Sequence, residues 1–331
     1  MQNSDGIIII LSYPDTIVRP AYWEPSSKIW PLIGIGGKHA VQAGHAAFLL
    51  IKKESTEINY FDFGRYITTY GNGRVRSKET DPDVSITIKA KFEKGRLINL
   101  KEILLWIENH PEKTHGDGRL VASIHNEIDF NKASKFINEL LNKKEIPYGA
   151  FIKNGTNCAR FVTDAIIFSS INESVKKQLK QSNLFTPSPI GNVIKGNTDN
   201  KIYNIFNQQI SDYKNRSITK EYKASFFKKI EGEPNLKGTE VANLAVFELE
   251  NGTWLGGIGS GAWFRIEEQL SLETYKISRY NAKGVKDFED FFLLTQTDFN
   301  HLEAHQFVHP TNCTEVFIQQ KNNTFSFKKK S

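Results

Sequence analysis

The hydrophobic pattern of the first 190 residues predicts a mixture of strands and helices. Residues 7–13 begin with four isoleucines and a leucine, which is typical of a buried strand. Apolar residues recur every three or four positions over 130–142, so an amphipathic helix is expected there, beginning after Asp129. Further strands are expected at 44–52, 57–66 and 84–92, and further helices at 100–109 and from about residue 157.

The pattern changes after residue 200 to short strand-like runs. These runs occupy 240–250, 254–258, 262–267, 275–280, 288–295, 314–320 and 324–328. The preceding stretch, 183–200, is rich in Pro, Gly, Asn and Ser, a composition typical of a loop or linker. The sequence therefore predicts an α+β fold, with a first domain over 1–190, a linker over 191–200 and a smaller, mostly-β accessory domain over 201–331.

The composition of the 331 residues narrows the classes of partner. Aromatic residues make up 12% of the chain, enough for a substantial core, and the net charge is only +6. Because no nucleic-acid-binding motif accompanies the basic residues, nucleic acid is not an expected partner. No apolar run is long enough to predict an integral membrane segment, and two cysteines cannot form a disulfide scaffold. The apolar run at 7–11 is too short for a signal peptide, so the protein is expected in the cytoplasm.

Cys158 is the first candidate for chemistry. A glycine and polar residues at 155–157 run directly into the expected helix, which places the thiol in its first turn. There the unpaired backbone N–H groups and the helix dipole stabilise a thiolate, and the same N–H groups can hold the oxyanion of an acyl-transfer intermediate. The alternative is that Cys158 is a small buried side chain without a chemical role.

His45 and Asp62 are expected to meet on two neighbouring strands. His45 opens one strand and Asp62 lies in the next, with a hairpin turn near residues 53–56 between them. Side-chain alternation puts Tyr60 and Asp62 on one face, close enough for Asp62 to hydrogen-bond the imidazole. An imidazole oriented by a carboxylate is the base that an activated cysteine requires. Glu57 is the alternative carboxylate.

Five short motifs lie in order along the first domain. They are Trp30-Pro31-Leu32, Ala43-Gly44-His45-Ala46, Tyr60-Phe61-Asp62-Phe63-Gly64-Arg65, Glu112-Lys113-Thr114-His115-Gly116 and Asn154-Gly155-Thr156-Asn157-Cys158-Ala159-Arg160-Phe161-Val162. A strand with His45, an acid on the next strand and Cys158 at a helix start resemble circularly permuted papain-fold enzymes. This is the NlpC-like superfamily, which includes the lecithin retinol acyltransferase group and in which the histidine precedes the cysteine. Over roughly residues 5–190 the sequence is also similar to a bacterial family of unknown function.

The resemblance implies acyl transfer through a thioester in a permuted papain-like domain. Cys158 would attack a carbonyl carbon, His45 would take and return the proton, and Asp62 would hold the imidazole tautomer. The substrate would be peptide-like or an acyl compound. The expected contacts to this substrate are Tyr60, Asn157 and His115.

The predicted function is therefore that of a cysteine-dependent hydrolase, an amidase or peptidase that transfers the acyl group to water. Three alternatives stay open. One is an acyltransferase or thioesterase on lipid-like substrates, and another is a non-catalytic binding module on the same scaffold. The third is a toxin or effector that acts on host or rival cells, although the N-terminal sequence gives no indication of secretion. A cysteine mechanism requires no cofactor, and none is expected. The sequence makes no prediction of the oligomeric state.

Two further patterns are weaker candidates. Three histidines and a cysteine recur every fourth residue from His301 to Cys313, but Pro310 interrupts the helix that a metal site of this spacing requires. No metal is therefore expected. The glycine-rich run 256–261 lacks the lysine and the helix of a phosphate-binding loop, and a hairpin turn flanked by two tryptophans is expected there instead.

Overall fold

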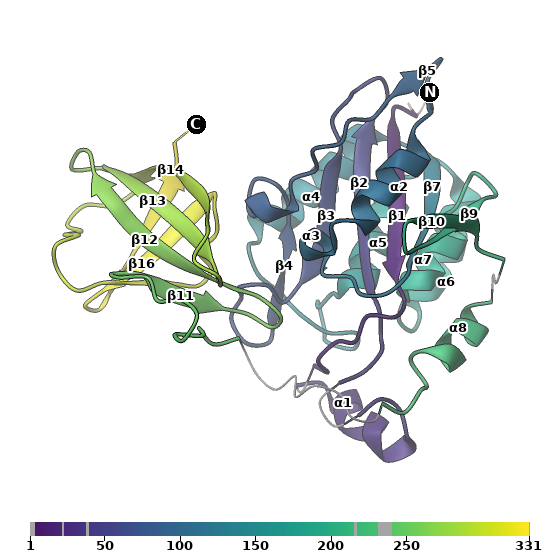
Figure 1. The fold of residues 1–331 in the computed structure, drawn as a ribbon, viewed down its shortest axis with the longest axis horizontal. Coiled ribbons are helices and arrows are strands. Elements are labelled where there is room, and N and C mark those ends of the chain that lie inside the picture. The colour runs from purple at the N-terminus through teal and green to yellow at the C-terminus, as the bar shows by residue number, and fades with distance from the viewer. Residues whose placement is uncertain (1–3, 22, 38–39, 215–216, 231–239, 331) are drawn as a thin grey trace.

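The computed structural model describes residues 4–21, 23–37, 40–214, 217–230 and 240–330. The fold is α+β, and an eight-stranded sheet and a seven-stranded sheet form two units that lie side by side (Figure 1). A two-stranded hairpin joins β5 (Phe92–Glu93) to β6 (Arg96–Leu97). Every helix in the described ranges is too short or too polar to span a membrane.

All strand pairs in the first sheet are antiparallel. The order is β10-β9-β7-β1-β2-β3-β4-β8. The strands are β1 (Gly6–Tyr13), β2 (His45–Lys52), β3 (Asn59–Gly64), β4 (Asn72–Arg76), β7 (Leu120–Ile128), β8 (Ile146–Pro147), β9 (Ile202–Phe206) and β10 (Gln209–Asp212).

Helices cover both faces of this sheet and form a three-layered unit (Figure 1). Strand β1 is apolar on both sides because Ile8 and Ile10 pack on one helix layer, while Ile7 and Ile9 pack on the other. The first layer consists of α4 (Phe130–Asn142), α5 (Cys158–Ser169), α6 (Glu173–Asn183) and α7 (Pro189–Lys195). The second layer is built on α2 (Leu100–Glu108).

Short helices complete the first unit. They are α1 (Pro25–Ile29), η1 (Trp30–Ile33), η2 (Pro82–Val84), α3 (Pro111–Thr114) and α8 (Ile218–Ala224). The helices predicted at 100–109 and 130–142 are confirmed as α2 and α4. Asp129 caps α4 as expected, because its side chain accepts a hydrogen bond from the backbone N–H of Lys132 at 3.0 Å.

The second unit is a single antiparallel sheet, as the mostly-β prediction requires. Its order is β11-β12-β13-β14-β17-β16-β15, and phenylalanines dominate its core. The strands are β11 (Thr253–Gly256), β12 (Gly261–Gln269), β13 (Thr274–Asn281), β14 (Lys286–Leu294), β15 (Gln306–Val308), β16 (Glu315–Gln320) and β17 (Asn323–Lys329). The glycine-rich run is the β11–β12 turn, where Trp254 pairs with Trp263, which confirms the expected hairpin.

Two predicted strands are wrong. Over 84–92 only Phe92 joins a strand, although Val84 and Ala90 are buried as the alternation indicated. These side chains pack in the α2 layer, so the alternation reflects contact with a helix layer rather than pairing with a strand. Residues 240–250 form turns before β11, and Leu249 packs on an aromatic cluster of the second sheet.

The linker predicted at 191–200 requires a correction. Half of this stretch belongs to α7, where Pro189 occupies the first turn and the Ser188 side chain caps the helix. A proline and a serine in these positions start a helix, although the same residues are also typical of loops. Strands β9 and β10, which the prediction assigned to the second domain, pair with β7 and extend the first sheet.

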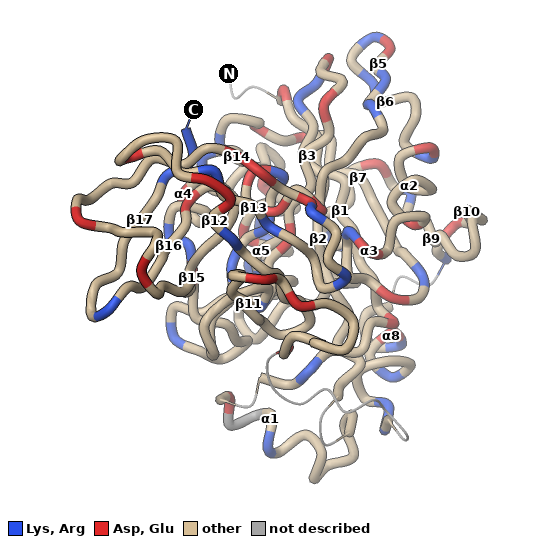
Figure 2. Tube along the Cα trace, turned by 60° about the vertical axis from the view of Figure 1, so that its left-hand side comes forward, with Lys and Arg blue, Asp and Glu red and all other residues tan. Residues whose placement is uncertain are grey.

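The second unit lies on the β4 side of the first sheet (Figure 1). The backbone N–H of Ile258 donates to the carbonyl of Arg65 at 2.7 Å, and that of Cys313 donates to the carbonyl of Thr80 at 3.2 Å. Lysines and arginines are interspersed with acidic residues over both units (Figure 2). The two units therefore meet through specific hydrogen bonds next to β4.

Candidate active site

Cys158 is the first residue of α5, as the sequence predicted. The preceding Asn157 has an extended backbone, and its side-chain oxygen accepts a hydrogen bond from the N–H of Arg160 at 2.9 Å. This cap ends the loop and starts the helix at the cysteine. The side chain of Cys158 is half-buried, so the sulfur lies at a helix N-terminus with access to solvent.

His45 lies at the start of β2, and its imidazole contacts the carboxylate of Asp62 on β3. The Nε2 atom of His45 is 3.3 Å from Oδ2 of Asp62, which confirms the predicted contact. The strand register pairs Asp62 with Ala47, so the two side chains are one alternation apart along the sheet. Gly44 precedes the strand with a φ of +74°, a backbone conformation that glycine adopts without strain.

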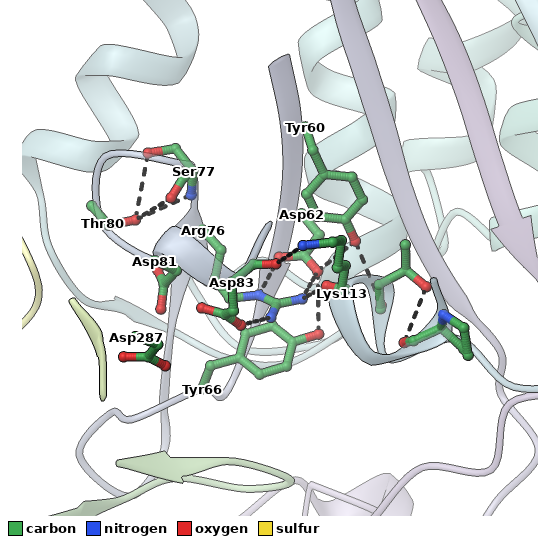
Figure 3. A network of polar contacts seen from close by, with 12 residues as sticks. Tyr60, Asp62, Tyr66, Arg76, Ser77, Thr80, Asp81, Asp83, Lys113 and Asp287 are labelled. Carbon is green, nitrogen blue, oxygen red and sulfur yellow. Dashed lines mark hydrogen bonds and ion pairs between the residues drawn. The ribbon is translucent and has the colours of Figure 1, made fainter. Parts of the chain in front are cut away.

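Asp62 is buried in a dense network of donors (Figure 3). Arg76 on β4 reaches both carboxylate oxygens, with Nε 3.0 Å from Oδ1 and Nη2 2.5 Å from Oδ2. The hydroxyls of Tyr60 and Tyr66 donate to Oδ2 at 2.9 and 3.3 Å. Burial raises the pKa of both tyrosines well above the usual value, so both hydroxyls stay protonated.

These contacts determine the charge of Asp62. Burial alone would raise the pKa of this carboxyl, but the charge of Arg76 and the hydrogen bond from His45 hold it well below its usual range. Asp62 is therefore a carboxylate at neutral pH. Glu57, the alternative partner for the histidine, is exposed and forms an ion pair with Lys78.

The imidazole of His45 contacts Asp62 and lines the same cavity as Cys158. Burial alone would lower the pKa of His45, but its hydrogen bonds with Asp62 and Cys158 raise it to about 9. His45 is thus an imidazolium at neutral pH. A positive charge next to the sulfur stabilises negative charge on it.

The cysteine and the histidine open into a cavity of about 540 Å³ between the two units. On the first unit, Arg65 forms part of the lining. Its guanidinium lies 4.6 Å from the centre of the Tyr148 ring and donates to the backbone carbonyls of Arg19 and Pro20. The second unit contributes its β11–β12 turn, including Ile258. The cavity is large enough for a short segment of a peptide or acyl chain.

Of the three predicted substrate contacts, His115 lines this cavity. Burial and the charge of Arg76 lower the pKa of His115 to about 4, so its ring is neutral and lies 5.2 Å from that of Tyr66. Tyr60 lies behind Asp62 and is not among the described residues that line the cavity, and the same holds for Asn157. Their side chains instead hold Asp62 and cap α5.

Sequence reasoning missed the residues that hold Asp62. In β4, Val75 belongs to the hydrophobic core, so the flanking Arg74 and Arg76 project to the opposite side, and both are buried. Two arginines that alternate with a core valine on a strand are a signal that could have been used, because a buried guanidinium requires an anionic partner. The position of Tyr66 after the strand carries no such signal.

The histidines from His301 onward do not form a metal centre. His305 hydrogen-bonds the backbone carbonyl of Glu303 at the surface, and the Cys313 thiol is buried. Across the described ranges, no group of three or more His, Cys, Asp or Glu side chains is arranged to hold a metal ion.

Comparison with known proteins gives two family matches. The family model for type VI secretion system effectors like TseH matches residues 8–175, and the model for the DUF6695 C-terminal domain matches residues 252–330. The crystal structure of the type VI secretion system effector TseH is similar at 15% sequence identity, with a TM-score of 0.39, over 64% of this chain and 100% of that chain. No curated protein matches the chain.

Proposed function

The chain belongs to the family of type VI secretion system effectors like TseH, and we propose that it is a cysteine-dependent hydrolase of amide bonds. One observation carries this proposal: the imidazole of His45 contacts a buried carboxylate and lines the same cavity as Cys158, a half-exposed cysteine at a helix N-terminus whose thiol contributes to the raised pKa of the imidazole. A binding module has no need of a thiol beside an imidazolium that is held by a carboxylate. We further propose that the first unit has the permuted papain-like arrangement of NlpC-like enzymes, with the histidine before the cysteine.

In the proposed reaction, the sulfur of Cys158 attacks the carbonyl carbon of the substrate and forms a carbon–sulfur bond. The unpaired N–H groups at the start of α5 stabilise the negative charge that develops on the carbonyl oxygen. His45 gives its proton to the leaving amine, and the carbon–nitrogen bond breaks to leave a thioester. His45 then takes a proton from water, whose oxygen attacks the thioester, and the carboxylic acid leaves as the sulfur is released.

The surrounding residues keep this pair in place. Asp62 holds the Nε2 side of the imidazole, and Arg76 with the two tyrosine hydroxyls fixes the carboxylate. His115, neutral and in the cavity wall, is the proposed substrate contact. Each group therefore has a partner before substrate arrives, which lowers the reorganisation that the reaction requires.

The two units have different roles in this proposal. The first carries the reacting groups, and the mostly-β second unit is an accessory that closes one side of the cavity. Because the family consists of secretion system effectors, we propose that the protein acts after export rather than in the cytoplasm in which the sequence placed it.

The test uses the full chain with three chromogenic or fluorogenic probe sets: aminomethylcoumarin amides of short peptides, nitrophenyl esters and alkyl thioesters. We expect amide turnover that is lost in Cys158→Ala and kept in Cys313→Ala, the matched change at the other cysteine. Turnover of esters or thioesters alone would favour an acyltransferase or thioesterase. Equal rates for Cys158→Ala and the wild type with every probe would refute a cysteine mechanism.

A further inference from the structure

Buried charges extend from the candidate site toward the second unit. Arg279 lies on β13 of the second sheet and is almost completely buried, although it belongs to a different unit from His45. Its guanidinium reaches across to the segment at η2, with Nη1 3.4 Å from Oδ1 of Asp81 and Nη2 3.2 Å from Oδ1 of Asp83. An arginine of the accessory unit thus pairs with two carboxylates of the first unit.

Asp83 connects this arginine to the site. Its second oxygen, Oδ2, is 3.5 Å from Nη1 of Arg76, the residue whose other nitrogens hold Asp62 (Figure 3). Asp83 therefore lies between two arginines, and Arg76 lies between two carboxylates. The sequence of contacts runs from Arg279 through Asp83, Arg76 and Asp62 to His45.

We infer that Arg279 is a positioning residue for the Asp62–His45 pair, an inference that rests on the proposed function. Arg76 donates its two short hydrogen bonds to Asp62, whereas its contact with Asp83 is longer, at 3.5 Å. Arg279 makes this choice favourable because it neutralises Asp83 from the other side. Without Arg279, the uncompensated carboxylate of Asp83 attracts Arg76 and weakens its hold on Asp62.

None of the other described charged groups around Arg279 neutralises the Asp83 side chain in its place. Asp81 is already bound by Arg74 through two short contacts of 2.5 and 2.6 Å. Asp287 on β14 lies 3.5 Å from Arg279, and the thiol of Cys313 faces it as well. The ammonium of Lys113 donates to the backbone carbonyl of Asp83 and not to its carboxylate. Arg279 and Arg76 are the cations that contact the Asp83 side chain among the described residues.

The charged groups around the imidazole set the direction of the expected effect. His45 contacts Asp62 and interacts with Cys158, and Arg76, the neutral His115 and the ring of Tyr13 lie nearby. The guanidinium of Arg65 interacts with Cys158 from the cavity wall. Loss of a cation makes the environment of the site less positive, which disfavours negative charge on the sulfur of Cys158. Alkylation of Cys158, which requires that negative charge, should therefore need a higher pH.

The experiment measures the rate of alkylation of Cys158 by iodoacetamide as a function of pH, which requires no knowledge of the substrate. In Arg279→Ala we expect the acidic limb of the profile to move up by about half a pH unit, or about threefold in rate at a fixed pH on that limb. Arg279→Lys, which keeps the charge, should restore part of this shift. Arg265→Ala removes an arginine of the same sheet that pairs with Glu267 on its own strand, and it should leave the profile unchanged.

A second variant separates positioning from general stability. In Arg279→Ala/Asp83→Asn the competing charge is gone, so the acidic limb should return to the wild-type position. The same comparison with Arg279→Gln covers the case in which the alanine variants do not fold. Profiles that superimpose for the wild type and the Arg279 variants, or no return with Asp83→Asn, would overturn the inference. If wild-type Cys158 itself reacts no faster than an ordinary thiol, the proposed function fails instead.

Discussion

The pairing of Asp62 with Arg76 gives a quantitative prediction of stability. The side chains are 0% and 2% exposed, and two hydrogen bonds join the guanidinium to the carboxylate. Substitutions Arg76→Met and Asp62→Asn each leave one buried charge without this partner. Removal of one partner from a buried ion pair costs about 3–5 kcal/mol.

The structure places the two single variants within this range. After Arg76→Met, Asp62 keeps its contacts with His45 and two tyrosine hydroxyls, so we expect a loss of about 3 kcal/mol. After Asp62→Asn, Arg76 keeps Asp83 at 3.5 Å and the carbonyl of Lys113 at 3.2 Å, and we expect about 4 kcal/mol. The double variant buries neither charge and should lose only about 4 kcal/mol rather than the sum of about 7.

The assay is urea unfolding at neutral pH, monitored by circular dichroism of the helices, because the helices of the described residues all belong to the first unit. The three variants and the wild type form a double-mutant cycle with an expected interaction energy of about 3 kcal/mol. The reasoning would be refuted if the double variant lost as much unfolding free energy as the two single variants together, within about 0.5 kcal/mol. Independent sites are additive in that way.

Three further predictions concern the free energy of unfolding. Burial raises the pKa of Asp287 to about 6, so the folded protein binds its proton more tightly than the unfolded chain does. Relative to Asp287→Asn, the unfolding free energy of the wild type in urea should therefore fall by about 2 kcal/mol as the pH rises from about 4 to 6. The pKa of His45 is raised to about 9, so the charged imidazole contributes about 3 kcal/mol to the free energy of unfolding. This contribution is complete below about pH 6.5 and is lost as the pH rises through 9. Urea unfolding of His45→Gln should not show this loss. Asn157→Ala removes the cap of α5 and should lower the unfolding free energy by about 1 kcal/mol, whereas an unchanged value would contradict the capping role.

Local sequence patterns were sufficient to predict the contact between His45 and Asp62. Both residues lie in one hairpin, and the alternation of strand residues fixes which side chains share a face. The start of α5 at Cys158 follows from the polar cap residue before an amphipathic run. These features depend on neighbours within the same element or the next one.

The remaining features depend on contacts between distant parts of the chain. Arg279 and Asp83 are 196 positions apart, and no local pattern indicates that they meet. The prediction of a strand at 84–92 was wrong for the same reason, because it depends on what the segment packs against. Alternation alone does not distinguish a neighbouring strand from a helix layer. Residues 202–212 join the first sheet because β7 offers them a free edge, which only the assembled sheet shows.

The central claim is that His45 activates Cys158, and the alkylation rate of the native protein at pH 6 tests it most directly. Iodoacetamide modification is followed site by site by mass spectrometry, with the buried Cys313 as the internal reference. We predict rapid modification of Cys158 in the wild type and a rate at least about tenfold lower in His45→Ala, because the imidazolium no longer stabilises the thiolate. Equal rates for Cys158 in the two proteins, or a wild-type rate no higher than that of Cys313, would contradict the claim.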